Sequence, residues 1–154
     1  MNLFGLMDTS GSAMQAERMR AEVVAANMAN AETTRTESGG PYQRQHVIFA
    51  ANQGDNSFSN SLSNATRQSS STSGGEPAGG VHVAQVVADN APPLKRYDPG
   101  HPDAGPDGYV AYPDINPLTE MVDLMGATRA YGLNSSAVQA EKSMITSALD
   151  IARS

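Results

Sequence analysis

Residues 116–152 read NPLTEMVDLMGATRAYGLNSSAVQAEKSMITSALDIA, and they carry the strongest structural signal in the chain. Asn116 is a good N-cap residue, and Pro117 suits the first position of a helix. Apolar side chains then recur at the 3–4 spacing of one helix face. The sequence therefore predicts a C-terminal helix over residues 117–154, with a seam that comprises Met121, Leu124, Tyr131, Val138, Ile145 and Leu149.

One column of this helix is apolar throughout, namely Leu124, Tyr131, Val138 and Ile145. Apolar residues that recur every seven positions form a seam facing a partner helix. We therefore expect the column to be buried against an N-terminal helix or a neighbouring subunit, and Glu141 to lie off the seam. At about 1.5 Å per residue the helix would be roughly 50 Å long. A chain of 154 residues cannot cover so long a helix on all sides, so part of its surface should face other molecules.

Two glycines, Gly126 and Gly132, lie inside the predicted helix. Each costs about 1 kcal/mol relative to alanine in a helix interior. They are either tolerated at the surface or allow a neighbouring helix to approach closely, and the sequence leaves both interpretations open.

The N-terminal segment, residues 1–34, has the spacing of a second helix. Its seam is predicted to comprise Met7, Met14, Ala21, Val24 and Met28. Ser12 followed by Gln15 fits a capping box, so the helix begins either there or near Leu3. Asn and Thr side chains compete for backbone hydrogen bonds, which predicts that the helix ends among Asn27, Asn30, Thr33 and Thr34.

The middle of the chain divides into three parts. Residues 35–51 are predicted to form a connecting extended segment, with a strand-like run at 42–50. Residues 52–80 are rich in Ser, Gly and Asn and predict a flexible loop, because such a composition cannot offset the entropy cost of ordering the backbone. Residues 81–116 alternate Val-rich runs with turn formers, which predicts a small β-rich region containing an antiparallel hairpin or sheet.

Composition excludes several classes of protein. Only 25 of 154 residues are Leu, Ile, Val or Phe, so the core should be thin, and the chain has no Cys for a disulfide or a thiolate metal site. A net charge of −6 without a basic cluster argues against nucleic-acid binding. The longest apolar runs are far shorter than the roughly 20 residues of a transmembrane helix. No Lys or Arg precedes Arg18, so we expect no cleavable secretory signal.

An acidic loop is the one cluster that could hold a metal. It contains Asp98, His101, Asp103, Asp107 and Asp114, but neither the carboxylate spacing of a calcium loop nor a second nearby His. Asp-Pro and Asp-Gly pairs are typical of turns, which is the interpretation we favour. We expect no catalytic residue, no metal and no cofactor, and the sequence indicates that the protein is not an enzyme.

Both ends of the chain resemble the signatures of flagellar rod and hook proteins. The N-terminal match is Ala-Asn-Met-Ala-Asn-Ala-Glu-Thr-Thr at residues 26–34, and the C-terminal match begins at Asn116. Two middle motifs, at residues 40–45 and 97–110, resemble those of proximal-rod members of the family. The positions that carry the resemblance are Asn27, Asn30, Thr33, Tyr42, Asp98, Pro99, Gly100, Gly108, Tyr109, Asn116, Glu120, Met121, Arg129, Tyr131 and Asn134.

The resemblance implies an α+β fold in which the terminal helices pair as a coiled-coil module and the middle forms a small β-rich domain. It implies a structural subunit of the proximal rod of the bacterial flagellar basal body, which spans the periplasm and transmits motor torque. The implied partners are the rod proteins FlgB, FlgF, FlgG and FliE, copies of the chain itself, and the flagellar type III export apparatus.

One alternative comes from another class of function. A soluble coiled-coil adaptor or a secreted binding domain, unconnected with flagella, would also show long helical seams and a thin core. The two hypotheses differ in whether both helices are needed for assembly into a larger structure.

Overall fold

The computed structural model describes residues 3–52 and 79–153, and most of the predicted loop at 52–80 lies outside these ranges. The described elements, in chain order, are α1 (Leu3–Ala29), β1 (Gln45–Ala51), β2 (Val81–Ala88), β3 (Leu94–Tyr97), β4 (Tyr109–Tyr112) and α3 (Pro117–Arg153). The fold is α+β, as the sequence predicted. No helix within the described ranges has an apolar stretch long enough to cross a bilayer.

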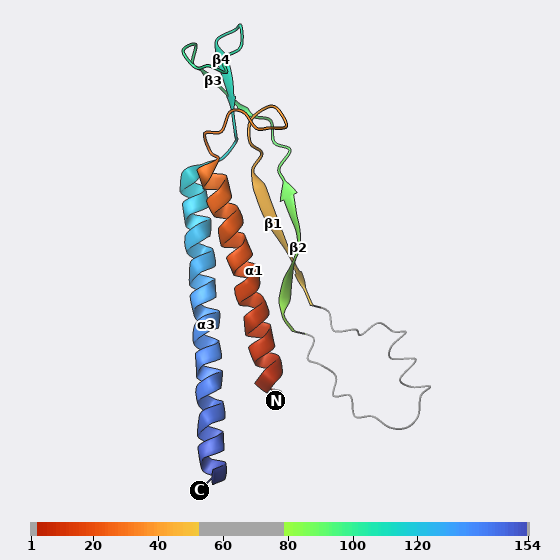
Figure 1. The fold of residues 1–154 in the computed structure, drawn as a ribbon, viewed down its shortest axis with the longest axis vertical. Coiled ribbons are helices and arrows are strands. Elements are labelled where there is room, and N and C mark those ends of the chain that lie inside the picture. The colour runs from red at the N-terminus through yellow and green to blue at the C-terminus, as the bar shows by residue number, and fades with distance from the viewer. Residues whose placement is uncertain (1–2, 53–78, 154) are drawn as a thin grey trace, which may run out of the picture.

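The molecule is elongated, and its helices set its long axis (Figure 1). α1 and α3 run antiparallel, side by side. The β1–β2 ribbon packs against α1 on the side away from α3, so α1 lies between the ribbon and α3. The β3–β4 hairpin lies beyond the end of both helices, at the pole opposite the first and last helical turns.

α1 begins at Leu3 and runs through Ser12, so the predicted start near Leu3 is confirmed. The alternative start at a Ser12 capping box is wrong. The Ser12 hydroxyl donates a hydrogen bond to the Thr9 carbonyl oxygen (2.8 Å) and accepts one from the Val81 amide nitrogen (3.1 Å). A Ser inside a helix commonly bonds back to the preceding turn. Ser12 also fastens the start of β2 to the helix.

Within the described ranges, the strands form two separate two-stranded antiparallel sheets. β1 pairs with β2 from Gln45↔Ala88 to Ala51↔Val81, with a bulge between Ile48 and Phe49. β3 pairs with β4 from Leu94↔Tyr112 to Tyr97↔Tyr109. The sequence predicted the strand segments, but it treated the run at 42–50 as a connection. Its pairing with β2, across the Ser-rich segment, was not foreseen.

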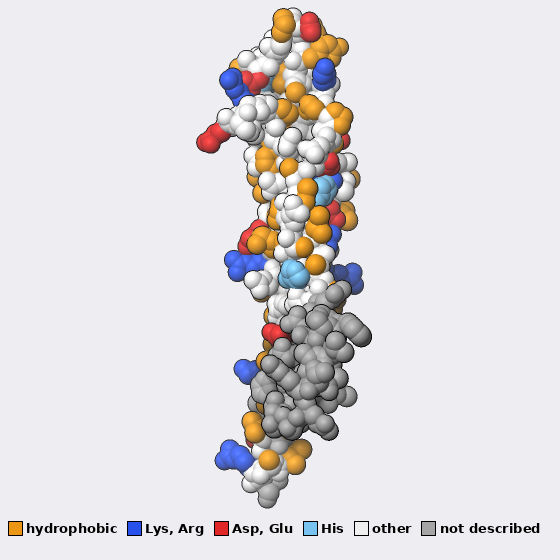
Figure 2. Space-filling view, turned by 90° about the vertical axis from the view of Figure 1, so that its right-hand side faces the viewer, with side chains coloured by type: hydrophobic (Ala, Val, Ile, Leu, Met, Phe, Trp, Pro, Cys, Tyr) orange, Lys and Arg blue, Asp and Glu red, His pale blue; other side chains and the backbone are white. Residues whose placement is uncertain are grey.

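The buried hydrophobic residues of the described ranges are few and form two groups. Ala16, Val23, Val24 and Ala127 lie where α1 meets α3 and the ribbon, and Val110, Tyr112 and Ile115 lie at the base of the β3–β4 hairpin. Figure 2 shows the ribbon side of the molecule, where hydrophobic side chains are interspersed with polar and charged ones over the part that the described residues occupy. The thin core expected from composition is confirmed for the described residues.

The buried line of α3 differs from the predicted seam. It passes through Glu120, Ala127 and Glu141, with Asn134 half-buried at the seven-residue step between the last two. The prediction that Glu141 lies off the seam is wrong, because this side chain is only 2% exposed. The physical reason is that Glu120 forms a buried ion pair with Arg44, which fixes the rotation of the helix.

The predicted seam residues flank this line. Leu124, Val138 and Ile145 are half-buried, whereas Met121, Tyr131 and Leu149 are exposed in the isolated subunit. On α1, Val24 is buried, and the remaining predicted seam residues, Met7, Met14, Ala21 and Met28, are half-buried. Whether the exposed members contact a neighbouring subunit stays a prediction. Gly126 and Gly132 have open space around them within the described chain.

Candidate functional site

A buried polar cluster joins the end of α1, the start of β1 and the start of α3. We call its members, Asn27, Tyr42, Arg44, Gln45 and Glu120, the clasp. Asn27 is the central member and is only 1% exposed. Its Nδ2 donates to the Gln45 carbonyl oxygen (2.9 Å) and to Glu120 Oε2 (3.1 Å). Its Oδ1 accepts from the Gln45 amide nitrogen (2.9 Å) and from the Tyr42 hydroxyl (3.2 Å).

Glu120 provides the negative charge of the clasp, although it is the most deeply buried ionisable residue described, at 1% exposure. Arg44 donates from Nε to Glu120 Oε1 (2.7 Å), and its Nη2 forms an ion pair with the same oxygen. A buried carboxylate needs both a countercharge and hydrogen bonds. Arg44 supplies the first, and Asn27 and Arg44 together supply the second.

A second layer of charge surrounds this ion pair. Asp123 Oδ1 lies 3.4 Å from Arg20 Nη2, and Asp123 Oδ2 lies 3.8 Å from Arg44 Nη2. These contacts connect α1, the ribbon and α3 in one chain of alternating charge. They are more exposed than the Glu120 pair and contribute less, because water screens them.

Tyr42 closes the clasp on the side of the ribbon. Its burial, and next the negative charge of Glu120, raise the pKa of its hydroxyl above the ordinary value of 10.0. The hydroxyl therefore stays protonated and donates to Asn27 over the whole neutral range.

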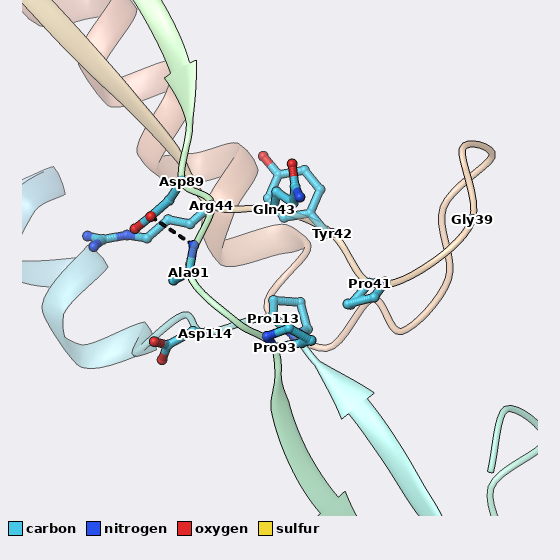
Figure 3. A pocket seen from close by; sticks show the side chains of 10 residues that line it. All are labelled: Gly39, Pro41, Tyr42, Gln43, Arg44, Asp89, Ala91, Pro93, Pro113 and Asp114. Carbon is cyan, nitrogen blue, oxygen red and sulfur yellow. Dashed lines mark hydrogen bonds between the residues drawn. The ribbon is translucent and has the colours of Figure 1, made fainter. Parts of the chain in front are cut away.

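A shallow crevice of about 150 Å³ lies beside the clasp, where the ribbon passes into the β3–β4 hairpin. Pro41, Pro93 and Pro113 form much of its wall, and Figure 3 shows the Arg44 side chain extending away from them toward α3. Asp89 is engaged at the rim, where its Oδ1 accepts from the Ala91 amide nitrogen (3.1 Å). The proline-rich wall favours a stiff junction between elements over a reactive site.

Four members of the acidic loop, Asp98, His101, Asp103 and Asp107, lie in the turns between β3 and β4, whereas Asp114 follows β4. His101 Nδ1 accepts from the Asp103 amide nitrogen (3.1 Å), and Asp103 Oδ2 accepts from the Thr34 hydroxyl (2.7 Å). Asp98 pairs with Gly108 through the backbone, and the Tyr97 and Tyr109 rings meet edge to face. Among the described residues no group of three potential metal-ligating side chains comes together. The observed contacts between β3 and β4 are therefore those of turns, which is the interpretation that the sequence favoured.

The structure brings together some of the residues that carried the family resemblance and separates others. Asn27, Tyr42 and Glu120 meet in the clasp. Asn116 caps α3 by accepting from the Leu118 amide nitrogen (3.0 Å), as the sequence predicted. The remaining positions lie elsewhere: Asn30 and Thr33 bond to each other after α1, Asp98, Pro99, Gly100, Gly108 and Tyr109 lie in the hairpin, and Met121, Arg129, Tyr131 and Asn134 lie along α3.

Sequence reasoning did not assign a role to Arg44 and Gln45 of the clasp, or to Arg20 and Asp123 beside it. Arg44 and Gln45 lie within the motif at residues 40–45, which was the available signal. A single Arg in an extended segment does not reveal that its partner is 76 residues away.

Comparison with known proteins gives consistent matches to both ends of the chain, which include Asn27 and Glu120 of the clasp. The family model "Flagella basal body rod protein" matches residues 7–35, and "Flagellar basal body rod FlgEFG protein C-terminal" matches residues 107–151. The flagellar basal-body rod protein FlgC of Borreliella burgdorferi is 37% identical over 160 residues, which cover 98% of each chain. The FlgC of Bacillus subtilis is 37% identical over 99% of this chain and 100% of its own length, and that of Escherichia coli O157:H7 is 33% identical over 98% of each. The chain therefore belongs to the FlgC family of flagellar basal-body rod proteins.

Proposed function

We propose that this chain is a structural subunit of the flagellar rod and that it builds the rod through α1 and α3, paired as a coiled-coil module. The β3–β4 hairpin and the ribbon form the outer part of the subunit. The observation that supports this assignment, beyond family membership, is an exposed apolar face on α3. A helix that buries only one of its apolar sides within its own chain has a second side available for a neighbour.

The exposed apolar face lies opposite the buried line of α3. Its members are each at least half exposed and recur along one side of the helix; we call them the outer stripe: Leu118, Val122, Met125, Leu133 and Met144. Exposed apolar residues gathered on one face mark interaction sites more often than scattered ones do. The outer stripe is interrupted by the exposed Arg129 between Met125 and Leu133. A Cβ added at Gly132, next to Leu133, would meet no atom within 4 Å apart from its own neighbours and helix backbone, which leaves space for another helix to approach there.

The partners we propose are the other rod proteins, FlgB, FlgF, FlgG and FliE, together with copies of the chain itself. The subunit would reach the basal body through the flagellar type III export apparatus and transmit motor torque as part of the periplasm-spanning rod. Its role is mechanical rather than enzymatic, in keeping with the proline-walled crevice and the turn-forming acidic loop described above.

The experiment is complementation of a strain that lacks the gene, using Leu133→Asp. Leu133 is 67% exposed, so the purified variant should fold and unfold like the wild type. A charge in an apolar contact between subunits is costly, so the variant should fail to restore swimming. Gln85→Asp adds the same charge at an exposed position on β2, away from the outer stripe, and should swim. Normal swimming with Leu133→Asp would exclude the outer stripe as a rod contact, and a null strain that swims normally would favour the adaptor hypothesis.

A further inference from the structure

We propose that the clasp fixes the orientation of the β structure only when α1 and α3 are paired with each other. We call this arrangement a lock. The inference concerns the subunit itself and is independent of which surface contacts a neighbour. It follows from the origin of the groups: one comes from α1, one from α3, two from the segment that leads into β1, and one from the first residue of β1.

The first step is the contact between α1 and the ribbon. Asn27 presents one donor and one acceptor to the amide and carbonyl groups of Gln45, the first residue of β1. The side chain of a helical residue thereby makes the pair of bonds that a neighbouring strand would make. These two bonds determine where the ribbon starts on the helix and in which direction it leaves.

The second step is the requirement for α3. Asn27 Nδ2 also donates to Glu120, and Arg44 reaches the same carboxylate from the ribbon segment. If α3 were displaced, Arg44 would lose its buried countercharge and Asn27 one of its acceptors. If the ribbon segment were displaced, Glu120 would remain buried with no countercharge from Arg44, which is strongly unfavourable. Each pairwise contact thus depends on the third element.

The third step is transmission to the hairpin. The Asp89 amide nitrogen, just after β2, donates to the Arg44 carbonyl oxygen (2.7 Å), so the end of β2 is held at the clasp as well. From there Pro92 and Pro93 lead into β3, and Pro113 leads out of β4. Proline restricts the backbone to a narrow range of φ. An orientation fixed at the clasp is therefore carried to the β3–β4 hairpin with little freedom in between.

The test measures the distance between the helices and the hairpin in the purified full-length chain. The chain has no Cys, so Arg18→Cys on α1 and Lys95→Cys on β3, both exposed, give two specific spin-label sites. We expect one narrow distance distribution in the labelled parent. Asn27→Ala and Glu120→Ala should each broaden it at least twofold, and the double variant should be no broader than either single variant, because both changes open the same lock.

Two controls separate a lock from simple stabilisation. Val24→Ala removes buried apolar contacts from α1, so it lowers stability but should leave the distribution narrow. Asn30→Ala removes two hydrogen bonds at the end of α1, to Ala26 and Thr33, and should also leave the distance distribution narrow.

If Glu120→Ala fails to fold, Glu120→Gln, which keeps the shape and removes the charge, is judged by the same criterion. A narrow distribution in a folded Glu120 variant, or equal broadening by Val24→Ala, would overturn the proposal.

Discussion

Asn27 and Gln45 face each other across 18 residues of sequence and exchange two hydrogen bonds of 2.9 Å, one in each direction. The bonding pattern is that of two opposed residues in an antiparallel sheet, although one partner is a side chain on a helix. An amide side chain is the natural choice for this position, because it offers a donor and an acceptor side by side. Neither an acid nor a hydroxyl would reproduce both bonds.

Replacing Asn27 with Ala should lower the free energy of unfolding by about 2 to 4 kcal/mol, because it leaves buried polar groups of Gln45, Tyr42 and Glu120 without a partner. Asn27→Asp should be at least as damaging, since it places a second carboxylate beside Glu120. Urea denaturation of the purified chain measures both. Asn30→Ala, at the same end of α1, should cost much less, and equal losses at the two positions would contradict the special role of Asn27.

Replacing Gly80 with Ala should destabilise the junction between β2 and α1 by about 1 to 3 kcal/mol. Gly80 has a φ of +108°, and an added Cβ would lie 2.8 Å from Ser12 Oγ and 3.1 Å from Asn52 Nδ2. Gly39→Ala is the matched control, because Gly39 also has a positive φ, of +81°, but open space around it. The difference between the two midpoints of thermal unfolding isolates the steric term, and no difference would show that the ribbon can move away from Ser12 freely.

Replacing Glu141 with Met should raise the free energy of unfolding by about 1 kcal/mol, because an apolar side chain of similar size suits a buried seam better than a carboxylate does. Glu141 Oε2 has no hydrogen-bond partner in the part of the chain that the structure describes. Glu22→Met provides the control at an exposed position, where only a surface ion pair with Arg18 is lost. A marked loss of stability on Glu141→Met would mean that the carboxylate makes a favourable contact in solution.

Replacing Tyr42 with Phe should reduce the loss in free energy of unfolding that the wild type shows above about pH 10. The pKa of Tyr42 is raised in the folded chain, so the folded state keeps this proton at a pH where the unfolded state has lost it. Its contribution is complete below the unfolded value of about 10 and is lost as pH rises through the raised folded value. Urea denaturation from pH 8 to 11 should therefore show the wild type losing its advantage over Tyr42→Phe above about pH 10. A constant difference between the two would contradict the shift.

The sequence predicted those features that depend on nearby residues. The cap at Asn116, the helical spacing of both ends and the strand segments are all local patterns, and the structure contains them. The clasp could not be predicted in this way, because Asn27 and Glu120 are 93 residues apart, and the motifs that contain them do not indicate that the two side chains meet. The rotation of α3 was misjudged for the same reason: hydrophobic spacing alone favours Leu124 and Tyr131, whereas the pairing of Glu120 with Arg44 turns the helix toward Ala127.

Ionic strength acts unequally on the charged contacts of this molecule. The Debye length falls to about 3 Å at 1 M salt, and the attraction between exposed charges falls with it. Arg18–Glu22 and Arg20–Asp123 are open to the solvent and will weaken accordingly. The Glu120 side of its pair with Arg44 is withdrawn from water, at 1% exposure against 25% for Arg44, so salt screens this pair much less. The attachment of the ribbon to the helices should therefore respond less to the surrounding electrolyte than the surface ion pairs do.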